Sequence, residues 1–243
     1  MFSYAMMTAP GSRAVNEDAV GCFEKAGQQC FVLCDGLGGH GLGDVAAAMA
    51  RDTFQTVFSQ TETLDGFLER AFTAAQERLL AEQRLRNAKH KLKTTAVALA
   101  TDGRTAHIGH IGDSRLYVFS GGQIVARTCD HSVPQMLAQA GVIGDDEIRH
   151  HPDRGTILRA LGMEWDEPAY ELRQPLYLEQ CQAALLCSDG FWELIDEQQM
   201  CSLLDSAETA DQWLSAMTDA VRRAGAGKDM DNYSAIALWN QRG

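Results

Sequence analysis

Residues 31–50 read FVLCDGLGGHGLGDVAAAMA. The four apolar residues at the start, bounded by turn formers, predict a buried strand that ends at Asp35. Glycines then dominate the loop, and Asp44 followed by small apolar residues predicts the start of a helix. A carboxylate held on a strand, beside a loop that exposes main-chain carbonyls, suits a hard cation. For this stretch alone, a tight turn with Asp35 as its cap explains the pattern equally well.

The same arrangement recurs at three other acids. Asp113 follows a predicted strand at 105–111, Asp189 follows the apolar run at 183–187, and Asp231 precedes a closing strand at 233–239. Each acid therefore lies where a strand meets a turn. A turn-forming role is a serious alternative for Asp113, because Gly-Asp-Ser is good turn chemistry. Four repetitions make coincidence a poor explanation, and we interpret the acids as one site.

Near the amino terminus, Arg13 precedes the acidic pair Glu17 and Asp18. In an extended segment the two acids point to opposite faces, so one can approach a metal while the other has another role. The planar guanidinium of arginine matches two oxygens of a phosphate group. Taken in isolation, the segment also fits a solvated loop with ordinary surface charges.

The remaining pattern indicates a mixed fold. Apolar positions at helical spacing predict a packing helix at 64–79, and short strands joined by tight turns at 94–127 predict antiparallel sheet. Asp130 or Ser132 is expected to cap a short helix that ends at Gly141. Residues 131–162 form a polar, irregular segment, which we interpret as a lid or recognition flap.

Composition narrows the class of protein. The chain has 243 residues and no linker, repeat or low-complexity tract, so we expect one domain over 1–243. Its formal net charge of -12 argues against nucleic acid or an anionic membrane as a partner. The start lacks the features of a signal peptide and no stretch approaches a membrane span, which favours a soluble cytoplasmic protein.

A cluster of basic side chains lies at 84–93. We interpret it as a solvated loop, or alternatively as a contact for an acidic or phosphorylated partner. Its members are Arg84, Arg86, Lys89, Lys91 and Lys93.

The motifs taken together resemble one family. RAVNED at 13–18, DGLGGHGLGDVAA at 35–47, GDSR at 112–115, DHS at 130–132, ILRALG at 157–162, LLCSDG at 185–190 and DNYSAI at 231–236 occur in its order and spacing. The family is that of the metal-dependent protein phosphatases, the phosphatase 2C family, in its compact bacterial form. The resemblance covers nearly the whole chain from Arg13 to Trp239. It implies an α+β fold, a four-layer sandwich of two antiparallel sheets flanked by helix pairs.

The resemblance also implies a set of site residues and their cations. Asp35 would bridge two Mn²⁺ or Mg²⁺ ions, Asp189 and Asp231 would complete the shell of one, and the Gly36 carbonyl with waters would serve the other. Glu17 and Asp18 match the acidic pair beside this second ion. The ligand of a third, labile ion, shared with Asp189, would be Asp113. Arg13 would grip the substrate phosphate.

The chemistry implied is hydrolysis of phosphoserine and phosphothreonine in proteins, in opposition to a serine/threonine kinase. Phosphate monoesters hydrolyse so slowly that acceleration by up to about 10²¹ is needed, and a water activated between two cations can supply it. A phosphatase of small metabolites and an inert phosphoprotein-binding module remain the alternatives, and we expect a monomer. Where many eukaryotic members place a histidine as general acid, this chain has Leu37. We expect a water to supply the leaving-group proton, with His40 stabilising the loop.

Overall fold

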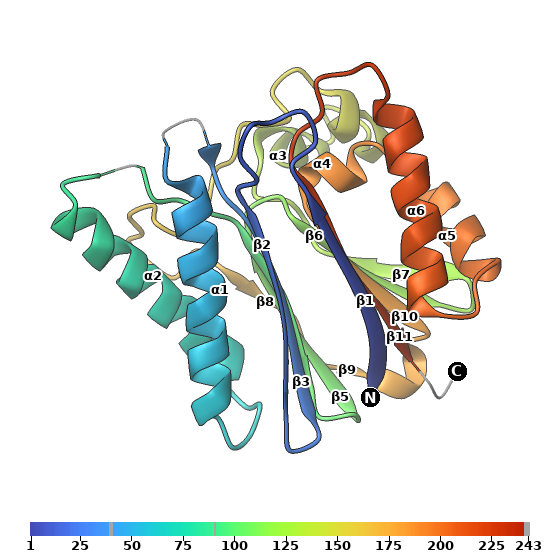
Figure 1. The fold of residues 1–243 in the computed structure, drawn as a ribbon, viewed down its shortest axis with the longest axis horizontal. Coiled ribbons are helices and arrows are strands. Elements are labelled where there is room, and N and C mark those ends of the chain that lie inside the picture. The colour runs from blue at the N-terminus through green and yellow to red at the C-terminus, as the bar shows by residue number, and fades with distance from the viewer. Residues whose placement is uncertain (39–40, 90, 241–243) are drawn as a thin grey trace.

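The computed structural model describes residues 1–38, 41–89 and 91–240, and their strands form two antiparallel sheets. The first sheet has the strand order β1 (Phe2–Ala9), β11 (Tyr233–Asn240), β10 (Ala183–Cys187), β6 (Arg115–Ser120) and β7 (Gln123–Arg127). The second has the order β2 (Asp18–Lys25), β3 (Gln28–Asp35), β4 (Ala96–Thr101), β5 (Thr105–Ile111) and β8 (Glu171–Leu172), and β9 (Leu176–Tyr177) also pairs with β5. The two sheets pack face to face at the centre of the molecule (Figure 1).

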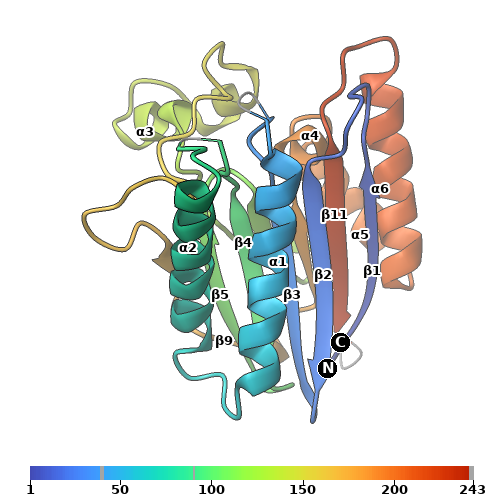
Figure 2. The ribbon, with the colours of Figure 1, turned by 60° about the vertical axis from the view of Figure 1, so that its left-hand side comes forward.

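Helices cover the outer faces of both sheets (Figures 1 and 2). The second sheet is covered by α1 (Gly43–Gln60) and α2 (Phe67–Leu85), and the first by α5 (Glu197–Asp205) and α6 (Ala210–Gly225). Shorter helical segments in the connections of the described chain include α3 (Val133–Gln139), η2 (Asp145–His150), η3 (Leu178–Gln180) and α4 (Asp189–Trp192). The predicted four-layer α+β sandwich is confirmed. None of the described helices is long and apolar enough to span a bilayer.

Strand β3 shows how the layers are built. Its alternate residues enter different apolar cores: Phe31 and Leu33 lie between the two sheets, whereas Val32 packs against α1 and α2. Because both faces are buried, the strand reads as an unbroken apolar run. Asp35 continues the Phe31–Leu33 face, since side chains alternate along a strand. Its carboxylate therefore points into the space between the sheets, at the end of the sandwich.

Local signals in the sequence explain several element ends. Ser132 accepts a hydrogen bond from the backbone N–H of Gln135 at 3.4 Å and caps α3. The predicted helix at 64–79 instead begins at Phe67, after Gly66 in a left-handed conformation, and continues to Leu85. Strand β1 was not predicted. It pairs along its whole length with β11 and forms the edge of the first sheet.

Candidate active site and metal centre

The two central acids of the second sheet face each other across a strand pair. Asp18 opens β2, Asp35 closes β3, and the register of the pair places them directly opposite. Directly opposed residues in an antiparallel pair project to the same face. Asp18 therefore also points between the sheets, and two carboxylates meet where the sandwich opens.

Hydrogen bonds to Thr94 and Thr95 hold the backbone of Asp35 in place. Its N–H donates to the hydroxyl of Thr95 at 3.0 Å, and its carbonyl accepts from the Thr95 N–H and the Thr94 hydroxyl, both at 2.8 Å. At Gly36 a Cβ would collide with the backbone of Gly43 and Glu17, so only glycine fits there. Both residues are thus rigid parts of the sheet end.

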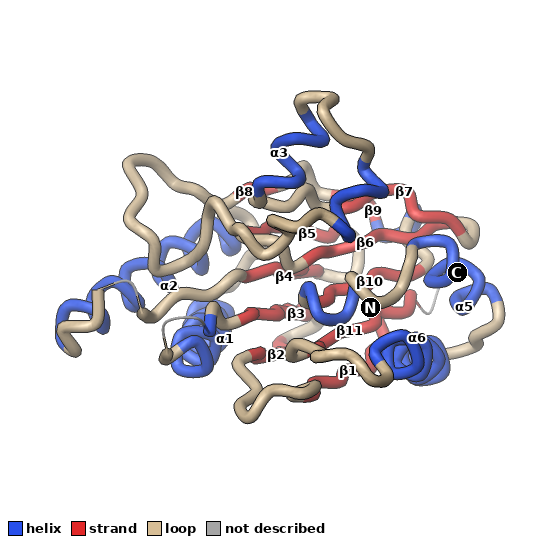
Figure 3. Tube along the Cα trace, turned by 90° about the horizontal axis from the view of Figure 1, so that it is seen from above, coloured by secondary structure: helices blue, strands red, loops and turns tan. Residues whose placement is uncertain are grey.

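The first sheet contributes the other acids to the same cavity. Asp113 lies in the β5–β6 turn, Asp189 begins α4 after β10, and Asp231 precedes β11. All three line a cavity of about 880 Å³ together with Asp35 and Gly36. These turns gather at one end of the sandwich, which Figure 3 shows from above. The structure therefore brings together acids that the sequence separates by up to about two hundred residues.

Burial and mutual repulsion act on the carboxyl groups. Burial is the main cause that raises the pKa of Asp18 to about 6 and that of Asp189 to about 7. Burial also raises the pKa of Asp35 and Asp113 well above the usual range, and the charge of Asp189 adds to both shifts. Without a cation, the cavity disfavours full ionisation of this group.

Two orphaned oxygens test whether cations fit the site. Among the described residues, Oδ1 of Asp18 and Oδ1 of Asp113 are buried with no hydrogen-bond partner. Unpartnered buried carboxylate oxygens are costly unless a positive charge is present. The acids beside them, Asp35 and Asp189, offer carboxylate oxygens, which suit Mg²⁺ or Mn²⁺ rather than zinc. The residues therefore fit a pair of hard divalent cations.

Glu17 is placed differently from the other acids. It lines the cavity, but its carboxylate also accepts hydrogen bonds from the backbone N–H groups of Gly43 and Asp44 at the start of α1. A Cβ on Gly38 would collide with this carboxylate. Burial nevertheless raises its pKa, ahead of the charges of Asp44 and Asp231. The side chain thus joins the glycine-rich loop to the helix N-terminus, where an anion is stabilised.

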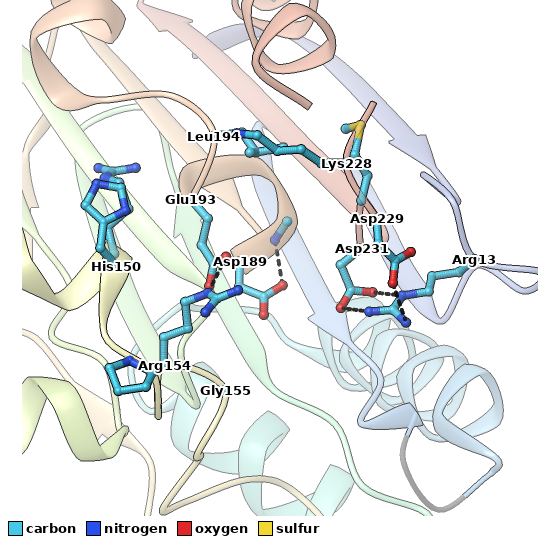
Figure 4. Close-up of a pocket in the computed structure, with 14 residues that line it drawn as sticks. Arg13, His150, Arg154, Gly155, Asp189, Glu193, Leu194, Lys228, Asp229 and Asp231 are labelled. Carbon is cyan, nitrogen blue, oxygen red and sulfur yellow. Dashed lines mark hydrogen bonds and ion pairs between the residues drawn. The ribbon is translucent and has the colours of Figure 1, made fainter. Parts of the chain in front are cut away.

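Arg13 forms a bidentate ion pair with Asp231 (Figure 4). Its Nε and Nη2 each donate to one carboxylate oxygen at 3.1 Å, and about half of each side chain is exposed. Asn232 fixes the two loops together, because it accepts from the Glu17 N–H and donates to the carbonyls of Pro10 and Val15. Arg13 consequently lies at the cavity mouth, over the neighbouring pocket drawn in Figure 4.

A buried charged network beneath the site was not recognised in the sequence. Arg115 makes a bidentate pair with Asp130 at 2.9 and 2.7 Å, and its guanidinium lies 3.4 Å from the ring centroid of Trp192. Trp192 in turn donates to the carbonyl of Asp113 at 3.0 Å. The GDSR and DHS motifs therefore meet in the interior. Asp130 does not cap α3, because its carboxylate is committed to Arg115.

The segment 131–162 borders the cavity on its far side. It contains α3 and η2, and Thr156 and Ile157 line the cavity with Met163 just beyond. Its base is tied down by a backbone pair between Thr94 and Leu161, with N–O distances of 3.2 and 2.9 Å. A lining role for these residues had no signal in the sequence.

The loop before β4, which carries the basic residues at 84–93, and the glycine-rich turn both contribute residues to the cavity. The solvated-loop interpretation holds for Lys91, which is exposed, but not for Lys93, which is half-buried and lines the cavity. Leu37 also lines the cavity, and its N–H donates to the Lys93 carbonyl at 3.0 Å. The interpretation of His40 falls outside the described residues.

Comparison with known proteins decides the family. The model of the family "Protein phosphatase 2C" matches residues 11–233. The chain belongs to the protein phosphatase 2C family. It is 29% identical over 231 residues to the serine/threonine phosphatase stp of Listeria monocytogenes, with 92% of this chain and 89% of that protein covered.

Solved structures of phosphatases have the same fold. The serine/threonine phosphatase Stp1 from Staphylococcus aureus superposes with a TM-score of 0.90 at 26% identity, covering 98% of this chain and 95% of Stp1. The catalytic domain of PstP in complex with two manganese ions gives a TM-score of 0.80 at 26% identity, covering 98% and 97%. The expected family, enzyme class and dependence on Mn²⁺ or Mg²⁺ are confirmed, and this phosphatase 2C chain is a protein phosphatase. Neither the metabolite phosphatase nor the inert binding module gains support.

Proposed function

We propose that this phosphatase hydrolyses phosphoserine and phosphothreonine side chains in proteins, and that the strand-end acids form its metal centre. The observation that carries the proposal is the convergence of Asp35, Asp113 and Asp189 in one cavity, with Asp18 directly opposite Asp35 on the neighbouring strand. The pKa values of these four acids are raised, and among the described residues one oxygen of Asp18 and one of Asp113 are buried without a partner. Relatives named serine/threonine phosphatase, in Listeria monocytogenes and Mycobacterium tuberculosis, support the class of substrate.

Each acid has a proposed role. Asp35, Asp189 and Asp231 would hold one cation, and Asp35 with the Gly36 carbonyl, Asp18 and Glu17 would hold the other. Asp113 would hold a third, labile ion together with Asp189. Bound Mn²⁺ or Mg²⁺ lowers the pKa of a water molecule and neutralises charge on the phosphoryl oxygens. The hydrogen bonds of Glu17 to the α1 backbone favour an indirect role for this residue.

Arg13 is proposed to bind the substrate phosphate. Its bidentate contact to Asp231 supports this role, because the guanidinium lies at the cavity and binds both oxygens of one anionic group. Phosphate offers the same pair of acceptors as a carboxylate. The guanidinium would be free for a phosphoryl group if Asp231 held a cation instead.

Several wider properties belong to the same proposal. The chain acts as one catalytic domain, with residues 131–162 as a flap beside the cavity that selects protein substrates. A serine/threonine kinase is its antagonist, and it works as a cytoplasmic monomer without nucleic acid or membrane partners. The net charge of -12 supports the last point, since it repels polyanions.

The test is hydrolysis of a phosphoserine peptide by the Mn²⁺-loaded chain, compared with glycerol phosphate as a small metabolite. We expect release of orthophosphate from the peptide with a kcat/KM at least about tenfold higher, because the open cavity and flap offer binding energy to a longer substrate. Preference for glycerol phosphate would contradict the assignment to protein substrates.

A further inference from the structure

Lys93 is held in the wall of the active-site cavity by its neighbours. Leu92 and Thr94 on either side are fully buried. The Leu92 carbonyl accepts from the Gln83 amide at 2.9 Å, and Thr94 makes the backbone pair with Leu161. The Lys93 carbonyl itself accepts from Leu37. The backbone at this position is therefore as well fixed as that of a sheet residue, although the sequence reads as a basic loop.

The ammonium group of Lys93 forms no ion pair within 4 Å in the part of the chain that the structure describes. No carboxylate of the described residues forms an ion pair with it, whereas the neighbouring Lys89 pairs with Glu164 at 3.2 Å and Arg13 pairs with Asp231. The side chain is half-buried, so part of its hydration is lost. A cation in such a position is stabilised when an anion enters the cavity.

Sheet topology places Lys93 and Arg13 on opposite flanks of Asp35. One neighbour of β3 is β2, which leads back through Asp18 to Arg13. The other is the chain entering β4, where Thr94 and Thr95 bind the Asp35 backbone and Lys93 comes just before them. Because Arg13 and Lys93 both line this cavity, an anion bound in it has one cationic residue on the β2 side and one on the β4 side.

We propose that Lys93 is a substrate-binding residue that donates hydrogen bonds to the phosphoryl oxygens of the phosphomonoester. A phosphomonoester dianion has three non-bridging oxygens, and the bidentate arginine fork satisfies only two acceptors. Lysine is a compact charge with three donors that adapts to the remaining oxygen. This inference rests on the proposed function and adds a residue to its substrate site.

The test uses orthophosphate as the probe and the Mn²⁺-loaded enzyme. The variant is Lys93→Met, which keeps the length of the side chain, and the matched control is Lys91→Met, two residues away and exposed. We expect the inhibition constant of orthophosphate against an aryl phosphate to rise about tenfold in Lys93→Met, the cost of a lost charge-assisted hydrogen bond. Lys93→Arg should recover part of the affinity, and Lys91→Met should leave it unchanged.

Two calorimetric titrations accompany the kinetics. Orthophosphate binding to the Mn²⁺-loaded protein should weaken by the same factor, while the affinity of the protein for Mn²⁺ stays unchanged. Unaltered affinity for orthophosphate in Lys93→Met would overturn the proposal, even if the KM of this variant for peptides rises. A parallel loss of Mn²⁺ affinity would also overturn it, because Lys93 would then act on the metal centre. Failure of the proposed function would show separately, as absence of peptide hydrolysis by the unaltered chain.

Discussion

At the scale of single residues, the site is a set of carboxyl groups that the fold holds too close together. Burial raises the pKa of Asp189 to about 7 and that of Asp18 to about 6. In the unfolded chain both return to ordinary values near 4. At pH values between about 4 and about 7, the native state binds more protons than the unfolded state. The free energy of unfolding therefore falls as the pH rises through this range. Bound cations remove the effect, since they compensate the negative charge.

We therefore expect the metal-free protein to lose stability as the pH rises from about 5 to 7.5. The measurement is urea unfolding in the presence of EDTA at several pH values. Asp189→Asn should show a shallower loss, because one of the raised carboxyl groups is gone and its neighbours feel less repulsion. Identical pH slopes for the unaltered chain and Asp189→Asn would refute this account of the crowding.

Residues also differ in how far the sequence reveals them. Asp35 and Asp189 could be predicted, because Asp35 directly follows an unbroken apolar run that must be a buried strand and only Ser188 separates Asp189 from another. Lys93 could not, since five basic residues lie at 84–93 and nothing local separates the one that faces the cavity. Its orientation depends on the pairing of Thr94 with Leu161, which are 67 positions apart by number. Long-range pairing of this kind leaves no short-range pattern.

At the scale of elements, Arg115 joins three segments beneath the cavity. It contacts Asp130 at the start of the flap, Tyr117 on β6, and Trp192 on α4. Through Trp192 the cluster reaches the Asp113 carbonyl. The side chains of Arg115 and Asp130 are 2% and 1% exposed, so each charge depends on the other.

Arg115→Met should destabilise the protein by about 3–5 kcal/mol, because it leaves the Asp130 carboxylate buried without its partner. The matched control is Arg127→Met, which breaks the 2.8 Å pair with the exposed Asp145. We expect that change to cost about 1 kcal/mol or less. Urea unfolding of the metal-loaded protein measures both, and a loss at Arg115 no larger than at Arg127 would exclude the structural role given to the buried pair.

The flap at 131–162 is tied to the body at both ends, by the hydrogen bond from the His131 N–H to the Gly112 carbonyl and by the Leu161–Thr94 pair. Replacing residues 136–150 by a short glycine-rich linker keeps these anchors. We expect a several-fold loss of kcat/KM on a phosphoserine peptide and little change on an aryl phosphate, which is too small to reach α3. Equal losses on both substrates would show that the segment only supports the fold.

At the scale of the whole molecule, the alternation of side chains along β3 positions the site. Residues 31, 33 and 35 share one face of β3, so the strand that fills the inner core also delivers its terminal acid between the sheets. The order of the motifs made the fold class predictable through family resemblance. Strand β1 was missed because its sequence, FSYAMMTA, lacks a strict apolar alternation and because its partner β11 lies at the opposite end of the chain.

Cations should stabilise the whole fold, since the proposed ligands come from both sheets and from loops more than 200 residues apart in the sequence. Saturating Mn²⁺ binds the native state in preference to the unfolded chain, and 100-fold excess over the dissociation constant contributes about 2.7 kcal/mol. We expect the Tm in Mn²⁺ to exceed that in EDTA by several degrees. An unchanged Tm would mean that the acids do not bind the ions when folded.

The most direct test of the central claim is the rate of orthophosphate release from a phosphoserine peptide by Asp35→Asn at saturating Mn²⁺. Asparagine keeps the size of the side chain and the backbone contacts to Thr94 and Thr95, but removes the charge that two cations would share. We expect turnover to fall by at least about a thousandfold while the circular dichroism spectrum stays that of the unaltered chain. Substantial turnover by this folded variant would contradict the assignment of Asp35 as the bridging carboxylate.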